Sequence, residues 1–283
     1  MNPRAVAVRA GVRRGRIEFG QTLRNPGELM GWLWMPVVAL LVMHAFGDGA
    51  TPGADFPLGA QAVPGILAMG VVFTGLMGLA LALTMDREDG TLLRARATPN
   101  GVLAYFVGRV LGKAALTVTV LLVVLAPALL LFDGLEPGRV STWLTLVWVL
   151  ALGLLAILPI GAVLGAVFGS TQSLGFVTLL IMVLVVVSGV FYPITALPGW
   201  LQQVGQAFPL YWTGLGLRSA LLPDSVAAAE VGGSWRPLWT AVALGAWAAA
   251  GLVLAPVVLR RMARRESGSS VAAKREQVAQ RFD

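Results

Sequence analysis

Long apolar runs separated by short polar segments dominate the hydrophobicity pattern of this chain. A helix needs about 20 apolar residues to cross the hydrocarbon core of a bilayer. Six runs meet or approach that length, and they cover residues 29–46, 64–85, 114–132, 143–168, 174–192 and 238–259. The pattern therefore predicts an all-α polytopic membrane protein with six transmembrane helices, in which residues 1–283 form a single domain and 29–259 form the bundle.

The N-terminal segment, residues 1–28, has a different pattern. Apolar side chains recur there at helical spacing, with arginines between them. The apolar set is Val8, Val12, Phe19 and Leu23. This favours a basic amphipathic helix lying on the inner leaflet, and a disordered basic tail is the alternative interpretation.

A second amphipathic segment precedes the last span. Its apolar side chains are again separated by three or four residues, with glutamines between them. They are Leu197, Leu201, Val204 and Phe208. Pro198 and Pro209 bracket the segment as start and stop signals, so we expect a short helix that dips into the outer leaflet or caps the outer end of the bundle.

Charge placement orients the predicted spans. The chain is 57% hydrophobic and 12% charged, with a formal net charge of +7. All but three of its 21 Lys and Arg residues fall on one side of the six-span topology if both termini are inside. Basic residues collect on the cytoplasmic side of membrane proteins. The excess of base therefore predicts an N-in, C-in protein of the plasma membrane with a basic tail at 260–283, and it does not require a nucleic-acid partner.

The chain lacks the residues that intrinsic energy coupling or catalysis would need. It has no cysteine and a single histidine, His44, which argues against a metal site. The predicted spans contain no Asp, Glu, Lys or Arg, which argues against a proton- or sodium-driven carrier. Paired carboxylates suited to catalysis are also missing. We expect a non-enzymatic chain that binds no cofactor and receives its energy from a partner.

One stretch superficially resembles a phosphate-binding loop. Gly108 and Gly112 are separated by three residues, and Lys113 is followed by alanine. A phosphate loop needs four intervening residues and a Ser or Thr after the lysine. The two glycines more plausibly allow another helix to approach closely.

Small residues and prolines mark several spans. Three prolines, Pro36, Pro127 and Pro159, are expected to kink their helices. Glycines thin one face of the second and fourth spans, where they favour tight helix contacts within one subunit or, alternatively, between subunits. These glycines are Gly70, Gly75, Gly78, Gly161, Gly165 and Gly169.

Between the second and third predicted spans lies a densely charged segment, residues 86–99. Thr91 could cap a short helix of about two turns, and Thr98-Pro99 begins a strong turn signal. A solvated loop that only anchors topology is the alternative. As a docking element, the segment would use Asp86, Glu88, Asp89, Gly90, Thr91, Leu92, Arg94, Thr98 and Pro99.

This segment resembles the cytoplasmic loop of the ABC-2 type permeases, in which an acidic cluster, Gly-Thr and a later Thr-Pro follow the second span. A second match surrounds the fifth span and the outer loop. Its residues are Ser188, Gly189, Pro193, Pro198, Pro209 and Arg218. Within that family the chain is most similar to the daunorubicin-resistance-type permeases, with Trp212 at a position where tyrosine is common.

The resemblance implies a membrane subunit that pairs with a separate ATP-binding cassette ATPase. Two permeases, identical or different, would assemble with two ATPases that bind ATP and Mg. Residues 86–99 would form the coupling helix, and the second and fifth spans would line the substrate path. The candidate path residues are Phe73, Met77, Met182, Val186 and Phe191.

Three functions remain open at this point. The first is a bacterial exporter of an amphiphilic drug, lipid-like compound or metabolite, which suits the uncharged spans. The second is an ABC exporter of polysaccharide or teichoic-acid-like polymer. The third, from a different class, is a secondary carrier without an ATPase.

Overall fold

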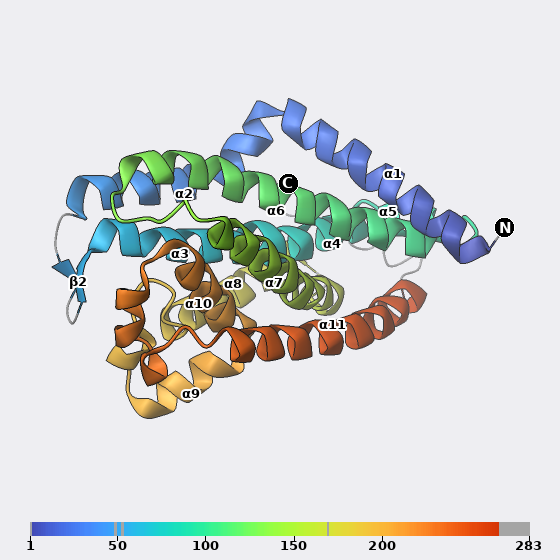
Figure 1. The fold of residues 1–283 in the computed structure, drawn as a ribbon. Coiled ribbons are helices and arrows are strands. Elements are labelled where there is room, and N and C mark those ends of the chain that lie inside the picture. Colours follow the sequence, from blue (N-terminus) through green and yellow to red (C-terminus); the bar gives the residue numbers. More distant parts are fainter. Residues whose placement is uncertain (1, 48–49, 52–53, 169, 266–283) are drawn as a thin grey trace.

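The computed structural model describes residues 2–47, 50–51, 54–168 and 170–265, and nearly all of the described chain is helical. Figure 1 shows long helices running side by side, with α1 (Pro3–Arg24) and α5 (Thr91–Arg96) at one end and α9 (Gly199–Ala207) toward the other. The last described helix, α11 (Pro237–Arg265), contacts α5, so it returns to the end where the chain begins. We call this the α5 end, and the opposite one the cap end.

Five helices in the described part of the chain are long and apolar enough to cross a membrane. They correspond to the predicted first, second, third, fourth and sixth spans. They are α2 (Pro26–Phe46), the continuous helix Leu58–Glu88, α6 (Gly101–Leu131), α7 (Val140–Val167) and α11. Pro36, Pro127 and Pro159 lie inside α2, α6 and α7, which continue past them.

The predicted fifth span, 174–192, is too long. Helix α8 (Thr171–Val187) has 17 residues and ends before a turn in which Gly189 has φ 56°. A left-handed residue cannot continue a right-handed helix, and glycine adopts this conformation at little cost. In place of the six predicted spans, the described structure has five apolar helices long enough to cross a membrane and one shorter apolar helix.

The core is built around the second apolar helix. It comprises α3 (Leu58–Gly70), a π-helical stretch at Val71–Met77, and α4 (Gly78–Glu88). Most of its side chains are buried, unlike those of α2 and α11, whose outer faces are exposed and apolar. The glycines predicted to loosen this span flank or occupy the π-helical stretch, where the backbone bonds from i to i+5.

Helix α7 packs directly on the backbone of this central helix. A Cβ added at Gly161 would lie 2.4 Å from the Leu76 carbonyl oxygen, and one at Gly165 would lie 2.6 Å from that of Ala80. Such spacing tolerates only glycine. The contact lies within one chain, which confirms the intrasubunit interpretation for these two glycines; Gly169 lies outside the described residues.

The cap end is more structured than the sequence predicts. A two-stranded antiparallel ribbon, β1 (Ala50–Thr51) and β2 (Ala54–Pro57), follows α2, so the all-α prediction is wrong at this point. The expected amphipathic helix is α9, which begins after Pro198. Pro209 then occupies the first position of a further, buried helix, α10 (Pro209–Leu221). Three 3₁₀ turns at Ile194–Ala196, Asp224–Ala229 and Val231–Gly233 complete the cap.

The N-terminal segment is helical, as predicted, but a different face makes its contacts. Ala7, Gly11 and Gly15 are the buried residues of α1, whereas Val8 and Val12 are exposed. Added Cβ atoms at Gly11 and Gly15 would lie 2.7 Å and 2.8 Å from carbonyl oxygens of α6. The small residues therefore seat α1 on α6. Val8, Val12 and Leu23 remain available to a lipid surface, whereas Phe19 packs against the core.

Candidate functional site

Helix α5 forms a sharp corner between α4 and α6. It spans six residues, which confirms the predicted short helix. Gly90, with φ 73°, turns the chain at its start, and Asn100, with φ 54°, turns it after its end. The predicted cap by Thr91 is wrong: its side chain caps no backbone N–H, and its hydroxyl instead accepts a 3.0 Å hydrogen bond from Arg94.

One side of this corner anchors it and the other is exposed. Leu92 is 1% exposed and belongs to the main apolar core, so it holds α5 against the bundle. The exposed side chains of the corner are Asp89, Arg94, Arg96, Thr98 and Pro99, with Glu88 half-buried. Of the nine predicted docking residues, only Asp86 and Leu92 are buried, and the others are exposed or partly exposed.

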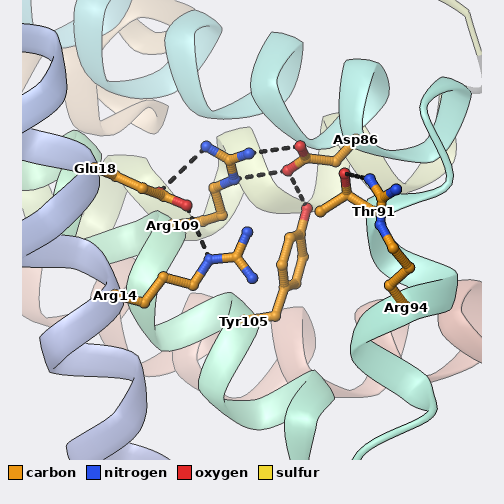
Figure 2. A network of polar contacts seen from close by, with 7 residues as sticks. All are labelled: Arg14, Glu18, Asp86, Thr91, Arg94, Tyr105 and Arg109. Carbon is orange, nitrogen blue, oxygen red and sulfur yellow. Dashed lines mark hydrogen bonds and ion pairs between the residues drawn. The ribbon is translucent and has the colours of Figure 1, made fainter.

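Asp86, the first residue of that set, lies inside the protein. It is 6% exposed and takes part in a polar network that joins α4, α6 and α1 (Figure 2). Arg109 donates to both of its oxygens, at 2.6 Å from Nε and 2.5 Å from Nη2. The Tyr105 hydroxyl donates to the same carboxylate at 2.5 Å. Paired bonds between a guanidinium and a carboxylate fix orientation as well as distance.

The network continues to the N-terminal helix. Arg109 Nη1 lies 3.2 Å from Glu18 Oε2, and Glu18 accepts a 2.9 Å bond from Arg14 one turn earlier in α1. The Arg14 guanidinium in turn lies 5.1 Å from the centre of the Tyr105 ring. The end of α4, immediately before the α5 corner, is thus tied by charged groups to two other helices.

A second contact ties the same corner to α7. Arg87 donates to the carbonyl oxygens of Gly165 and Ala166, at 3.4 Å and 3.1 Å. These carbonyls lie in the last turn of α7, where a helix has unpaired acceptors and a partial negative charge. Movement of α5 would therefore act on α1, α6 and α7 together.

At the cap end, the structure brings together residues of the second predicted motif. Arg218 of α10 is 2% exposed and donates to the carbonyl oxygens of Gly189 and Val190, at 3.0 Å and 3.4 Å. Its Nε lies 2.8 Å from Oε1 of Glu230, which is also buried. Pro193, Pro198 and Pro209 each stand at the start of a helical segment. Ser188 is completely buried beside this turn.

The five candidate path residues lie in three places. Phe73 and Met77 are half-buried in the π-helical stretch, and Phe73 lines a pocket of about 140 Å³ whose other wall is α2. Met182 and Val186 are 38% and 59% exposed on α8, pointing away from their own bundle. Phe191 packs near Gly65 of α3. The pocket beside Phe73 does not reach Met182 or Val186, so it does not connect the candidate path residues.

Several residues of these sites were not predicted from the sequence. Tyr105 and Arg109 stand four residues apart and so share one face of α6, a spacing that could have marked them as joint partners for an acid. Glu18 has a local partner in Arg14, four residues earlier, but its contact with Arg109 spans a long stretch of chain and had no local signal. Glu230 lies in an irregular turn, so its pairing with Arg218 had none either. Burial raises the pKa of the Tyr211 phenol in the cap above its ordinary value.

The long apolar helices indicate a multi-pass helical membrane protein. The chain belongs to the ABC-2 type transporter family, which matches residues 13–222. The match begins in α1 and ends just after α10, so it includes the whole α5 corner with its network and Arg218 of the cap, but not Glu230. A search of curated proteins returns no match.

Proposed function

We propose that this chain is the membrane-spanning subunit of an ATP-binding cassette exporter. In this proposal it moves an amphiphilic drug, lipid-like compound or metabolite outward across a bacterial plasma membrane, with both termini in the cytoplasm. A separate subunit binds ATP and Mg and hydrolyses the nucleotide. Membership of the ABC-2 type transporter family supports the proposal.

The observation that carries the proposal is the anchored corner at α5. An exposed short helix with mixed charges is suited to docking in a cleft of a partner, and charge complementarity would fix its register. Leu92 and the Asp86–Arg109 pair hold it rigidly to the bundle. A force applied to α5 would therefore reach α4, α6 and α1 without being lost in a flexible loop.

A second permease subunit, identical or different, would complete the path. Support comes from α8, whose apolar side chains are strongly exposed: Phe176, Leu179 and Leu180 are 69%, 64% and 70% exposed. Facing a second copy, Met182 and Val186 would line a shared path with uncharged walls. Such walls suit amphiphilic cargo better than a large hydrophilic polymer.

Charge reversal on the corner tests the docking role. We expect Glu88→Lys with Asp89→Lys to reduce recovery of the co-expressed ATPase with the purified permease by about tenfold, because like charges would face each other at the interface. The stimulated ATP turnover should fall in parallel. The measurement is copurification followed by ATPase activity in proteoliposomes.

The control is Asp133→Lys, one charge reversal in place of two, in an exposed turn at the cap end. It should leave copurification and turnover at wild-type values. Unchanged association in the Glu88/Asp89 variant would overturn docking through α5. A loss in the Asp133 variant alone would place the ATPase at the opposite end and overturn the proposed orientation.

A further inference from the structure

A pocket of about 340 Å³ opens beside the polar network at the α5 end. It lies between the elbow that joins α1 to α2 and the facing surfaces of α4 and α6. One part of its wall is apolar and includes Phe19, Leu81 and Leu116. The other part is charged. A volume of this size falls in the range of ligand pockets, which are mostly apolar with a few placed polar groups.

The charges in the pocket differ in whether they already have partners. Glu18 and Asp86 are both held by Arg109. Lys113 has no carboxylate within ion-pair distance among the described residues. Its ammonium instead lies 4.8 Å from the centre of the Trp32 ring. This leaves a positioned cation on the wall that can still bind an anion.

Glu28 supplies an opposite charge on another part of the same wall. It lies in the first turn of α2, and its Oε1 accepts a 3.1 Å hydrogen bond from Thr22. The pocket thus presents one cation and one anion that form no direct ion pair, although Glu28 is the carboxylate whose charge acts most strongly on Lys113. A zwitterion with an anionic and a cationic group a few atoms apart would satisfy both.

The surroundings indicate where such a ligand comes from. Met30 and Trp34, next to the pocket on α2, are 62% and 57% exposed, as expected of a helix facing lipid. Charged residues gather at this end, where apolar helices meet the headgroup layer. A phospholipid at that depth would place its headgroup among the charges and its glycerol and first methylenes against the apolar wall.

From this geometry we propose that the pocket binds an ethanolamine phospholipid of the adjacent leaflet, with its phosphate on Lys113 and its amine on Glu28. The lipid fills the elbow between α1 and α2 and holds α1 at the membrane surface beside α6. This binding needs no ATPase, so it stands independently of the proposed coupling function.

The test is lipid retention by the full-length chain. The protein is reconstituted in nanodiscs of equal phosphatidylethanolamine and phosphatidylcholine, extracted in mild detergent, and its bound lipids are counted by native mass spectrometry. Wild type should retain phosphatidylethanolamine preferentially. Lys113→Gln and Glu28→Gln should each lower that retention by about tenfold, the size of one contact to a charged group.

Two variants serve as controls. Lys113→Arg keeps the cation and should retain most of the lipid. Arg16→Gln removes one positive charge from an exposed site on α1 outside the pocket, and should behave as wild type. Thermal unfolding in lipid-free detergent shows whether each variant is folded. Because Glu28 is exposed, Glu28→Gln does not disturb the core.

Further arms separate the ligand classes. Soluble glycerophosphoethanolamine should compete only weakly, since it lacks the acyl chains; full competition would overturn a lipid ligand in favour of a soluble phosphodiester. Equal retention of phosphatidylcholine, whose quaternary nitrogen has no N–H to donate, would overturn the contact between the lipid amine and Glu28. Wild-type lipid retention in both Gln variants would overturn lipid binding in this pocket. Equal loss of lipid in Lys113→Gln and Arg16→Gln would overturn it as well.

Discussion

The two ends of the molecule hold charged side chains in different ways. At the α5 end, Asp86, Arg109 and Glu18 form a chain of contacts across three helices, and Arg109 and Glu18 remain 21% and 23% exposed. At the cap end, Arg218 and Glu230 form one pair in which both side chains are 2% exposed. The first arrangement shares its charges among several partners near solvent, whereas the second confines them to a closed interior.

The difference indicates that the cap pair fixes one element in place, whereas the network at the α5 end links elements that can still move. A buried pair is costly to desolvate and strongly destabilising when one partner is removed. It therefore holds α10 against the turn after α8 in a fixed position. In the α5-end network Arg109 and Glu18 are only partly buried, so they can exchange one partner for another or for water at a smaller cost than the cap pair. That property suits an end of the protein that must respond to another subunit.

The largest effect is expected at the cap pair. Glu230→Gln leaves the Arg218 charge buried without its carboxylate and should destabilise the folded protein by about 3–5 kcal/mol. Arg218→Met combined with Glu230→Leu removes both charges and should recover much of that loss. Denaturant unfolding in detergent measures both. If the single and double variants lose the same free energy of unfolding, the Arg218–Glu230 pair does not hold α10 in the way described.

A smaller loss is expected at the network. Asp86→Asn weakens the bonds from Arg109 and Tyr105 while Glu18 still neutralises the arginine, so we expect about 2–3 kcal/mol. ATP turnover stimulated by the permease should also fall. The control is Asp89→Asn, an exposed neighbour, which should stay within about 0.5 kcal/mol of wild type. A loss at Asp86 as large as that at Glu230 would erase the contrast between the two ends.

The seating of α1 gives an intermediate test. Gly15→Val would drive a side chain into the Gly108 carbonyl and should cost about 1–3 kcal/mol, or detach α1 from α6. Gly20→Val makes the same change in the same helix where nothing lies within 4 Å. Limited proteolysis of α1 in detergent should be faster for the Gly15 variant only. Equal rates in both would show that α1 does not depend on close packing.

The smallest change in stability is expected on the exposed face of α5. Arg94→Ala removes only the bond to Thr91 and should alter the free energy of unfolding by less than about 0.5 kcal/mol. Its ATPase copurification should nevertheless fall. Wild-type copurification would restrict docking to the acidic part of the corner.

The spans could be predicted because a long apolar run has few alternatives in a chain that enters a bilayer. Helix α10 was missed because its 13 residues are too few to cross, and its burial depends on the cap that surrounds it. The contact face of α1 was also missed. Glycine and alanine add nothing to a hydrophobic stripe, yet they decide how closely two helix backbones approach.

At the candidate site, the motif predicted where the α5 corner lies but not the buried contacts that hold it. Asp86 belongs by sequence to the charged segment, and only the return of α6 along α4 brings Tyr105 and Arg109 to it. Arg218 was identified by the motif, but its partner Glu230 lies in an irregular turn with no periodicity. Pairings across helices depend on the angle at which each helix is rotated, which local patterns do not encode.

The π-helical stretch at Val71–Met77 sets the rotation about the helix axis of the residues that follow it, Gly78–Glu88. Successive residues of an α-helix are rotated by about 100°, so each residue accommodated in a wider turn changes the direction in which every later side chain points. A continuous α-helix over Leu58–Glu88 would aim Asp86 elsewhere than at Arg109. Converting these seven residues from π-helix to α-helix would therefore rotate the α5 corner about the helix axis.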